Sequence, residues 1–278
     1  MRNDFAVMIC SHGRAETLTS YDMLRNQGYT GKIFVVIDDE DEQEEQYKKR
    51  FDCVEVFCKE AEYIKADGVI PGKQKGILYA RNACYDIAKR HDVKYFAEID
   101  DDFSGLYFRY ESEGKCKAKK INPLDGLFEV VCDLFESESL YAASILSQGN
   151  YIGGIKSAGL NKAIRICTSM FFLSTERRID FISSMNEDVC TCMHYGKMGK
   201  VFIGLNGTMC ETEPIGNNRF GNGMAEFYQK TSPYFRQFIP VIVRPDCMYV
   251  MERKETIKGG FRWANAVPMI INERYKRA

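Results

Sequence analysis

The segment KYFAEIDDD, residues 94–102, decides the fold class, because a mostly apolar run of six residues ends abruptly in three aspartates. An apolar run of this length is typical of a buried strand. Three further runs of the same kind precede it, at residues 5–10, 32–37 and 54–58. The first hundred residues therefore repeat one pattern.

Stretches with helical spacing of apolar residues lie between these runs. Leu18, Tyr21 and Leu24 mark the first, which we expect to end near Gly28, and residues 77–91 form the second. Strands that alternate with helices and are themselves nearly all apolar indicate βαβ units. We therefore expect an α/β fold with a Rossmann-like, mostly parallel central sheet and helices on both faces.

The second half of the chain is less regular. Strands are expected at residues 141–146, 164–173 and 201–205, with a glycine-rich link at 149–159 and a helical stretch at 189–199. Nothing in the composition marks a linker between independent domains. The 278 residues are expected to form one domain with two halves, residues 1–110 and residues 111–278.

Composition excludes several classes of protein. The net charge of −1 neither favours nor excludes a nucleic-acid partner. The eleven cysteines are odd in number, and many lie in apolar runs, which is typical of buried thiols rather than a disulfide scaffold. No run approaches the ~20 apolar residues of a membrane span, and we expect no signal sequence at the N-terminus. We expect a soluble protein of the cytoplasm.

Polar residues follow three of the four predicted N-terminal strands. The first ends in Ser11-His12-Gly13-Arg14, the second in Asp38-Asp39, and the fourth in Asp100-Asp101-Asp102. In open parallel sheets, ligands bind beyond the carboxyl ends of the strands, so these groups predict one binding site. Residues 38–45 hold seven acids, of which only Asp38 and Asp39 are expected to face the site.

The three adjacent aspartates predict a metal site. Neighbouring carboxylates repel one another unless a cation compensates, and Mg²⁺ or Mn²⁺ commonly joins one or two carboxylates to substrate phosphates. We expect Asp100 and Asp102 to be the ligands, with Asp101 turned away or bonded to backbone amides. A solvated acidic turn that caps a helix is the alternative.

These elements together resemble the GT-A glycosyltransferases. In that family an acidic residue after the second strand, here Asp38, lies against the nucleoside, and an Asp-x-Asp element holds the metal. Ala80-Arg81-Asn82 resembles the element whose arginine approaches the donor. Asn186-Glu187-Asp188 resembles the element that supplies the catalytic base, here Asp188 or, failing it, Glu187. A helix N-terminus is expected to lower the pKa of such a base.

A narrower resemblance is to the phage glycosyltransferases that modify DNA bases, including the group associated with TET-type dioxygenases and related to the base J glucosyltransferase. Ser11-His12-Gly13-Arg14 followed by Thr17-Leu18 matches their opening. The resemblance implies transfer of a hexose or pentose from a nucleotide sugar, such as a UDP-sugar, to a hydroxylated or hydroxymethylated pyrimidine in DNA. It also implies that residues 1–110 form the nucleotide-sugar-binding half and residues 111–278 the acceptor-binding half. A phage protein of this kind would act in the host cytoplasm.

The donor-binding candidates come from the strand ends, the loop PGKQKG and the Ala-Arg-Asn element. They are Ser11, His12, Arg14, Asp38, Asp39, Lys73, Arg81, Asp100 and Asp101. Lys73 could close over the diphosphate, but its loop lacks the P-loop spacing, and a solvated loop fits equally well.

Two basic segments are candidates for contacts with a DNA acceptor. Residues 109–120 hold five basic residues against two acids, and the tail from 253 onwards holds seven basic residues around Trp263. Arg109, Lys117, Arg262 and Trp263 are the residues expected to contact DNA. A C-terminal helix that packs its aromatics and solvates its charges is the alternative for the tail.

Other functions remain open at this stage. The acceptor could be a small molecule, a glycan or a protein. A sugar-nucleotide nucleotidyltransferase would share the sheet and the metal, but it would need a longer glycine-rich loop after the first strand than Gly13-Arg14 provides. A non-catalytic nucleotide- or DNA-binding module would leave the clustered carboxylates unexplained.

Overall fold

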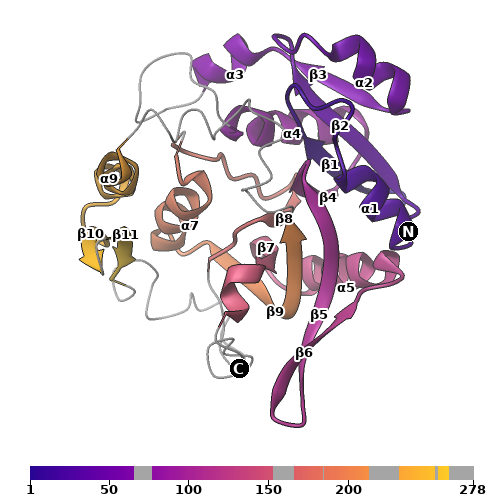
Figure 1. Ribbon diagram of the computed structural model, residues 1–278. Coiled ribbons are helices and arrows are strands. Elements are labelled where there is room, and N and C mark those ends of the chain that lie inside the picture. The colour runs from indigo at the N-terminus through magenta and orange to yellow at the C-terminus, as the bar shows by residue number, and fades with distance from the viewer. Residues whose placement is uncertain (66–76, 153–165, 184, 213–231, 254–255, 263–278) are drawn as a thin grey trace.

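A computed structural model describes residues 1–65, 77–152, 166–183, 185–212, 232–253 and 256–262. Its described strands form a nine-stranded sheet in the order β3-β2-β1-β4-β8-β7-β9-β5-β6 and a separate two-stranded sheet, β10-β11. Helices cover the large sheet (Figure 1). The α/β fold is therefore confirmed.

The four N-terminal strands are all parallel, as expected. They are β1 (Phe5–Cys10), β2 (Lys32–Asp38), β3 (Val54–Phe57) and β4 (Tyr95–Asp100). The helices of this region are α1 (Ser20–Asn26), α2 (Glu44–Arg50), α3 (Lys59–Lys65) and α4 (Leu78–Arg90). Helices α1 and α4 correspond to the two helical stretches expected from the sequence.

Side chains of β1 alternate between two hydrophobic cores, one on each face of the sheet. Phe5, Val7 and Ile9 join the core that α1 and α5 (Leu124–Ser137) cover. Ala6 and Met8 join the core that α4 covers on the opposite face. Successive side chains of a strand point to opposite faces of the sheet, so a strand that is buried on both faces needs a helical layer on each face. Helices on both faces are thus confirmed.

The second half of the sheet mixes parallel and antiparallel pairs. Strands β4, β8 and β7 run antiparallel in turn, β7 and β9 are parallel, and β9, β5 and β6 are again antiparallel. These strands are β5 (Phe103–Ser112), β6 (Lys115–Lys120), β7 (Leu140–Ser147), β8 (Met170–Ser174) and β9 (Val201–Thr212). The β5-β6 hairpin, which the sequence did not predict, extends beyond the rest of the sheet at the bottom of Figure 1.

The expected strand at 164–173 was too long. Residues 164 and 165 lie outside the described part of the chain, and β8 begins only at Met170. Ser169 has φ +67°, a left-handed conformation that an extended strand cannot contain, so pairing starts after it.

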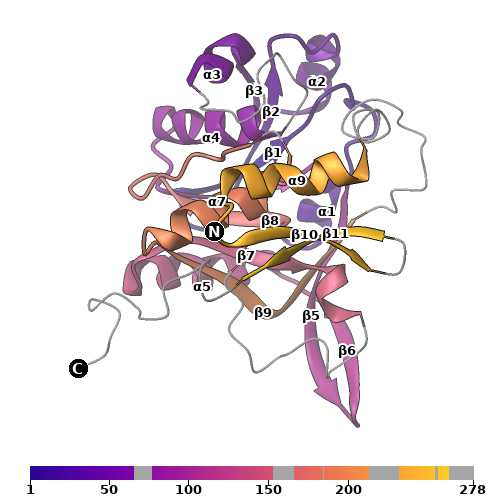
Figure 2. The same cartoon turned by 90° about the vertical axis from the view of Figure 1, so that its left-hand side faces the viewer.

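One 3₁₀ turn, two helices and two strands complete the described part of the chain. They are the 3₁₀ turn η1 (Gln148–Tyr151), α7 (Glu187–Lys197), α9 (Pro233–Val243), β10 (Met248–Arg253) and β11 (Thr256–Phe261). Figure 2 shows α9 lying along the β10-β11 hairpin. The C-terminal helix considered from the sequence does not include residues 256–261, which form a strand. No helix in the described ranges is long and apolar enough to cross a membrane.

Candidate functional site

The strand register brings the three polar strand ends to one edge of the sheet. Cys10, the last residue of β1, pairs with Val36 on β2 and with Asp100 on β4. The residues that follow these positions therefore emerge side by side. The grouping expected from the sequence is present in the structure.

Asp101 links the ends of β1 and β4. Its carboxylate accepts hydrogen bonds from the Ser11 hydroxyl at 2.6 Å and from Arg14 Nη1 at 2.7 Å. Its carbonyl oxygen accepts the amide of Thr19 at 3.0 Å. Burial raises the pKa of Asp101, against the lowering effect of the Arg14 guanidinium. Its side chain therefore bonds the side chains of Ser11 and Arg14, and not the backbone amides that were one of the two expected arrangements.

Tyr47 completes this connection, and the sequence did not single it out. The Arg14 amide donates to the Tyr47 oxygen at 2.8 Å, and the hydroxyls of Tyr47 and Ser11 lie 2.7 Å apart. Since the only Ser11 proton goes to Asp101, the Tyr47 hydroxyl donates to Ser11. Burial raises the pKa of Tyr47 to about 12, which keeps it a donor at neutral pH. The one signal in the sequence was an aromatic residue in an otherwise charged helix.

His12 and Asp38 form the second polar group of the site. His12 Nδ1 lies 2.8 Å from an Asp38 carboxylate oxygen, and Lys59 Nζ lies 3.5 Å from the other. The hydrogen bond to Asp38 raises the pKa of His12. Burial opposes ionisation of Asp38, but the His12 contact and Lys59 hold its pKa below the usual value. The pair leaves part of the imidazole exposed to a ligand.

The acidic turn after Asp38 differs from the expectation. Asp41 is buried and accepts the Gly13 amide at 2.8 Å, so it fixes the turn that carries His12. Asp39 is exposed and accepts the amide of Lys59, the first residue of α3, at 2.9 Å. Asp41, which the sequence did not single out, therefore supports the turn that carries His12, because the amide of left-handed Gly13 needs an acceptor.

Arg81 is the centre of the third group. It is only 3% exposed. Its Nη2 lies 3.2 Å from Asp100 Oδ1, its Nε 3.7 Å from Glu187 Oε1, and its Nη1 3.9 Å from Glu98 Oε2. The guanidinium also lies over two phenyl rings, with centroid distances of 4.8 Å to Phe171 and 5.3 Å to Phe181. One buried cation thus joins β4, β8 and the start of α7.

Glu98 was not singled out from the sequence, because it stands within an apolar strand. Its side chain is fully buried, and burial raises its pKa to about 8 in spite of the Arg81 charge. Carboxylates of Glu98, Asp100 and Glu187 surround one guanidinium, so the charge of Arg81 is compensated within the protein. Arg81 therefore contacts these carboxylates, and any effect on a donor would pass through Asp100.

Glu187 and Asp188 are the first two residues of α7. Burial raises the pKa of Glu187 to about 7, and Asp188 adds to the effect. Burial also raises the pKa of Asp188. The expectation of a lowered pKa was wrong, because loss of solvation outweighs the favourable helix N-terminus here.

The segment before α7 is held in place by the asparagine of the Ala-Arg-Asn element. Asn82 accepts the Phe181 amide at 2.7 Å and donates to the Phe181 carbonyl at 3.1 Å. Ser183 and Asn186 then have positive φ values of 71° and 50°. Such conformations persist only where surrounding contacts impose them. The start of α7 is therefore positioned by α4.

Asp100 and Asp102 supply two carboxylates at this edge. Asp100 is partly exposed. Asp102 is half-buried, and its burial raises its pKa to about 6, with a further contribution from the negative charges of Asp100 and Asp101. Among the described residues, no group of three His, Cys, Asp or Glu side chains could hold a metal ion by itself. A Mg²⁺ site nonetheless often has only one or two carboxylate ligands from the protein, and substrate phosphates supply further ligands.

The residues expected to contact DNA do not come together in one place. Arg109 lies over the Tyr151 ring at 5.1 Å, and Lys117 pairs with Glu113 at 2.9 Å on the β5-β6 hairpin. Arg262 is exposed, 5.8 Å from the Tyr249 ring, beside the separate small sheet. Lys73 and Trp263 lie outside the described residues.

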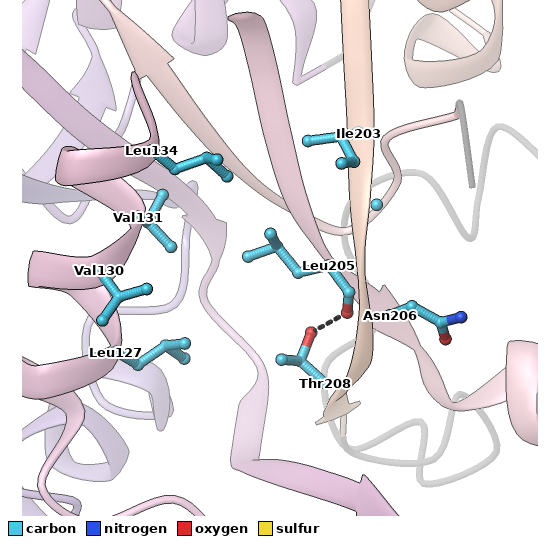
Figure 3. Close-up of a pocket in the computed structure, with 9 residues that line it drawn as sticks. Leu127, Val130, Val131, Leu134, Ile203, Leu205, Asn206 and Thr208 are labelled. Carbon is cyan, nitrogen blue, oxygen red and sulfur yellow. Dashed lines mark hydrogen bonds between the residues drawn. The ribbon is translucent and has the colours of Figure 1, made fainter. Parts of the chain in front are cut away.

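A hollow of about 320 Å³ lies between α5 and β9 (Figure 3). Leu127, Val130, Val131 and Leu134 line one side of it, and Ile203, Gly204, Leu205, Asn206 and Thr208 line the other. Its lining is mostly apolar. It offers none of the charged groups that a diphosphate requires.

Residues 5–221 match a family model described as TET-Associated Glycosyltransferase. No curated protein matches the chain. A solved structure from Desulfovibrio desulfuricans G20, described as a candidate nucleotide-diphospho-sugar transferase, has 8% sequence identity and a TM-score of 0.39 over 73% of this chain and 80% of that one. The family model spans most of the chain and the whole site described above, and on that match the protein belongs to the TET-associated glycosyltransferase family.

Proposed function

We propose that this glycosyltransferase moves a sugar from a nucleotide sugar, such as a UDP-sugar, to the hydroxyl of a hydroxylated or hydroxymethylated pyrimidine in DNA. The observation that carries the proposal is the position of Arg81 between Asp100 and Glu187, at 3.2 and 3.7 Å. The Arg81 guanidinium therefore lies between Asp100 at the end of β4 and Glu187 at the start of α7. The TET association in the family description supports a modified pyrimidine as acceptor.

The donor is proposed to bind across the ends of β1, β2 and β4. His12, with its raised pKa and exposed edge, is placed to donate to the nucleoside or a phosphate. Arg14 is held by Asp101 beside it. Asp100 and Asp102 would hold Mg²⁺ or Mn²⁺, which, when bound, stabilises the negative charge that develops on the leaving diphosphate.

Asp188 is proposed as the proton acceptor. The bond between the sugar and the diphosphate breaks, the acceptor oxygen bonds to the sugar, and the hydroxyl proton passes to Asp188. Glu187 faces Arg81 and positions the helix start, and Asp188 beside it is partly exposed to solvent. A raised pKa makes Asp188 a stronger base than an ordinary aspartate.

The test is mass spectrometry after the protein is incubated with a mixture of sugar nucleotides, Mn²⁺ and hydroxymethylated DNA. The proposal predicts a mass gain of one sugar on the DNA base and none with Asp188→Asn. A gain only on a small molecule, glycan or protein would overturn the DNA acceptor. Production of sugar nucleotides from sugar phosphate and nucleoside triphosphate would identify a nucleotidyltransferase instead.

A further inference from the structure

The β5-β6 hairpin presents two different faces. In its antiparallel register, Phe108 pairs with Lys119, Tyr110 with Lys117, and Ser112 with Lys115. Directly paired residues of antiparallel strands project from the same face. Two aromatic side chains and three lysines therefore share one surface. We call it the lysine face, made of Phe108, Tyr110, Lys115, Lys117 and Lys119.

The lysine face is open to solvent. Phe108 is 42% and Tyr110 43% exposed, and Lys115 and Lys119 are also exposed. The nearby acid Glu113 pairs with Lys117, but its side chain is 81% exposed, so water and salt screen that pair. The face therefore keeps a net positive character.

Part of the opposite face of the hairpin is packed against the protein, whereas Glu111, Ala118 and Lys120 on that face are exposed. Arg109 lies over Tyr151, and the Tyr107 hydroxyl donates to Glu211 at 3.0 Å. Cys116 packs against the small core that contains Tyr151. Arg109, which the sequence suggested for DNA contact, is thus used internally, and its neighbours on β5 point the other way.

Lysines on an edge strand have an ordinary explanation. They prevent an exposed edge from pairing with another chain, and β6 is an edge strand of the large sheet. That explanation does not account for Phe108 and Tyr110, which expose large apolar rings between the charges. A nucleic-acid-binding surface usually combines two kinds of side chain: lysines, which neutralise phosphates, and aromatic rings, which stack on bases.

The same strand connects this face to the proposed donor site. β5 begins at Phe103, directly after Asp102. At about 3.3 Å per residue, Phe108 lies ~20 Å and Tyr110 ~26 Å along the strand from Asp102. A DNA strand that rises ~3.4 Å per nucleotide covers this distance in about six to eight nucleotides. In Figure 1 the hairpin extends beyond the rest of the large sheet.

We infer that the lysine face binds the DNA acceptor six to eight nucleotides from the base that receives the sugar. The lysines contact phosphates, and Phe108 and Tyr110 stack on bases. The inference rests on the proposed function, since it takes DNA as the acceptor. It adds the surface that holds the DNA and the residues that form it.

Two variants and a matched control test the inference. K115Q/K117Q/K119Q removes the charges, and F108S/Y110S removes the rings. K32Q/K49Q/K89Q removes three exposed lysines from β2, α2 and α4 instead. Binding of fluorescent hydroxymethylated DNA is followed by anisotropy at several salt concentrations, and sugar transfer is measured on that DNA and on the free hydroxymethylated nucleoside.

The hairpin lysine variant is expected to bind DNA at least about tenfold more weakly than the control. The slope of log affinity against log salt should fall by about 2–3, at ~0.9 per lost phosphate contact. The ring variant should bind about tenfold more weakly with an unchanged slope, because stacking releases no counterions. Transfer to the free nucleoside should be unchanged in both, and K115R/K117R/K119R should restore DNA binding.

Equal DNA binding by the hairpin lysine variant and the control would overturn the inference, and the lysines would then only protect the edge. If that variant also glycosylated DNA normally, the proposed function would stand without the inference. Failure of the wild-type protein to modify any DNA, with transfer to another acceptor, would instead remove the proposed acceptor itself.

Discussion

Replacement of Arg81 by methionine is the most informative perturbation of the site. Methionine keeps much of the apolar volume between Phe171 and Phe181 but removes the charge that faces Glu98, Asp100 and Glu187. Breaking a buried ion pair by removing one partner costs about 3–5 kcal/mol, because the other charge stays buried without compensation. We expect Arg81→Met to lose that amount from the free energy of unfolding.

Arg90 on the same helix provides the control. Its guanidinium lies 2.7 Å from Glu55, but its side chain is 56% exposed. Exposed pairs contribute about 0–1 kcal/mol, so Arg90→Met should be nearly neutral. Urea denaturation, followed by circular dichroism, measures both.

The reasoning would be refuted by equal stability losses for Arg81→Met and Arg90→Met. In that case the three carboxylates would not depend on Arg81 for their compensation. The position of the α7 start would then need another explanation, since Arg81 would not hold Glu187 in place.

Three further predictions concern single side chains. Asp188→Asn should lower the rate of sugar transfer about 10²–10⁴-fold. The affinity for the donor, measured by calorimetry, should be unchanged. An equal loss of donor affinity would make Asp188 a donor-binding residue. Tyr47→Phe should cost about 1–3 kcal/mol in urea denaturation, because the Ser11 hydroxyl and the Arg14 amide lose a buried partner; a neutral result would show that water replaces it. The raised pKa of His12 gives stabilisation that is complete below its ordinary value of about 6.5 and is lost as pH rises through the raised value. The lowered pKa of Asp38 gives stabilisation that is present above about 3.9 and is lost as pH falls through the lowered value. The stability difference between wild type and His12→Asn should therefore be largest between about pH 4 and 6.5, and a difference that does not vary with pH would contradict the pairing.

The parallel strands and the grouping of their polar ends were predictable from the sequence. Apolar runs of strand length such as residues 5–10 and 32–37 depend on local composition alone. The rule that ligands bind at the carboxyl ends then brings Ser11, Asp38 and Asp100 together without knowledge of any contact. These predictions needed no long-range packing.

Other features depend on contacts that no local pattern contains. Asp101 could not be assigned to Ser11 and Arg14, because the pairing depends on how two loops approach each other. Burial of Glu187 and Asp188 at the start of α7 raises their pKa values, which is the reverse of the direction expected from the helix N-terminus. Residues 109–120 were recognised as basic, but only the strand register shows which of their side chains face solvent.

Binding of Mn²⁺, followed by electron paramagnetic resonance with and without UDP, tests most directly the proposal that Asp100 and Asp102 hold a metal against the donor diphosphate. Because no group of three potential ligand side chains is found in the described part of the chain, Mn²⁺ should bind weakly to the protein alone and much more tightly when UDP is present. Asp100→Asn/Asp102→Asn should abolish the tight binding. Mn²⁺ binding that is independent of UDP, or that survives the double substitution, would contradict this metal site.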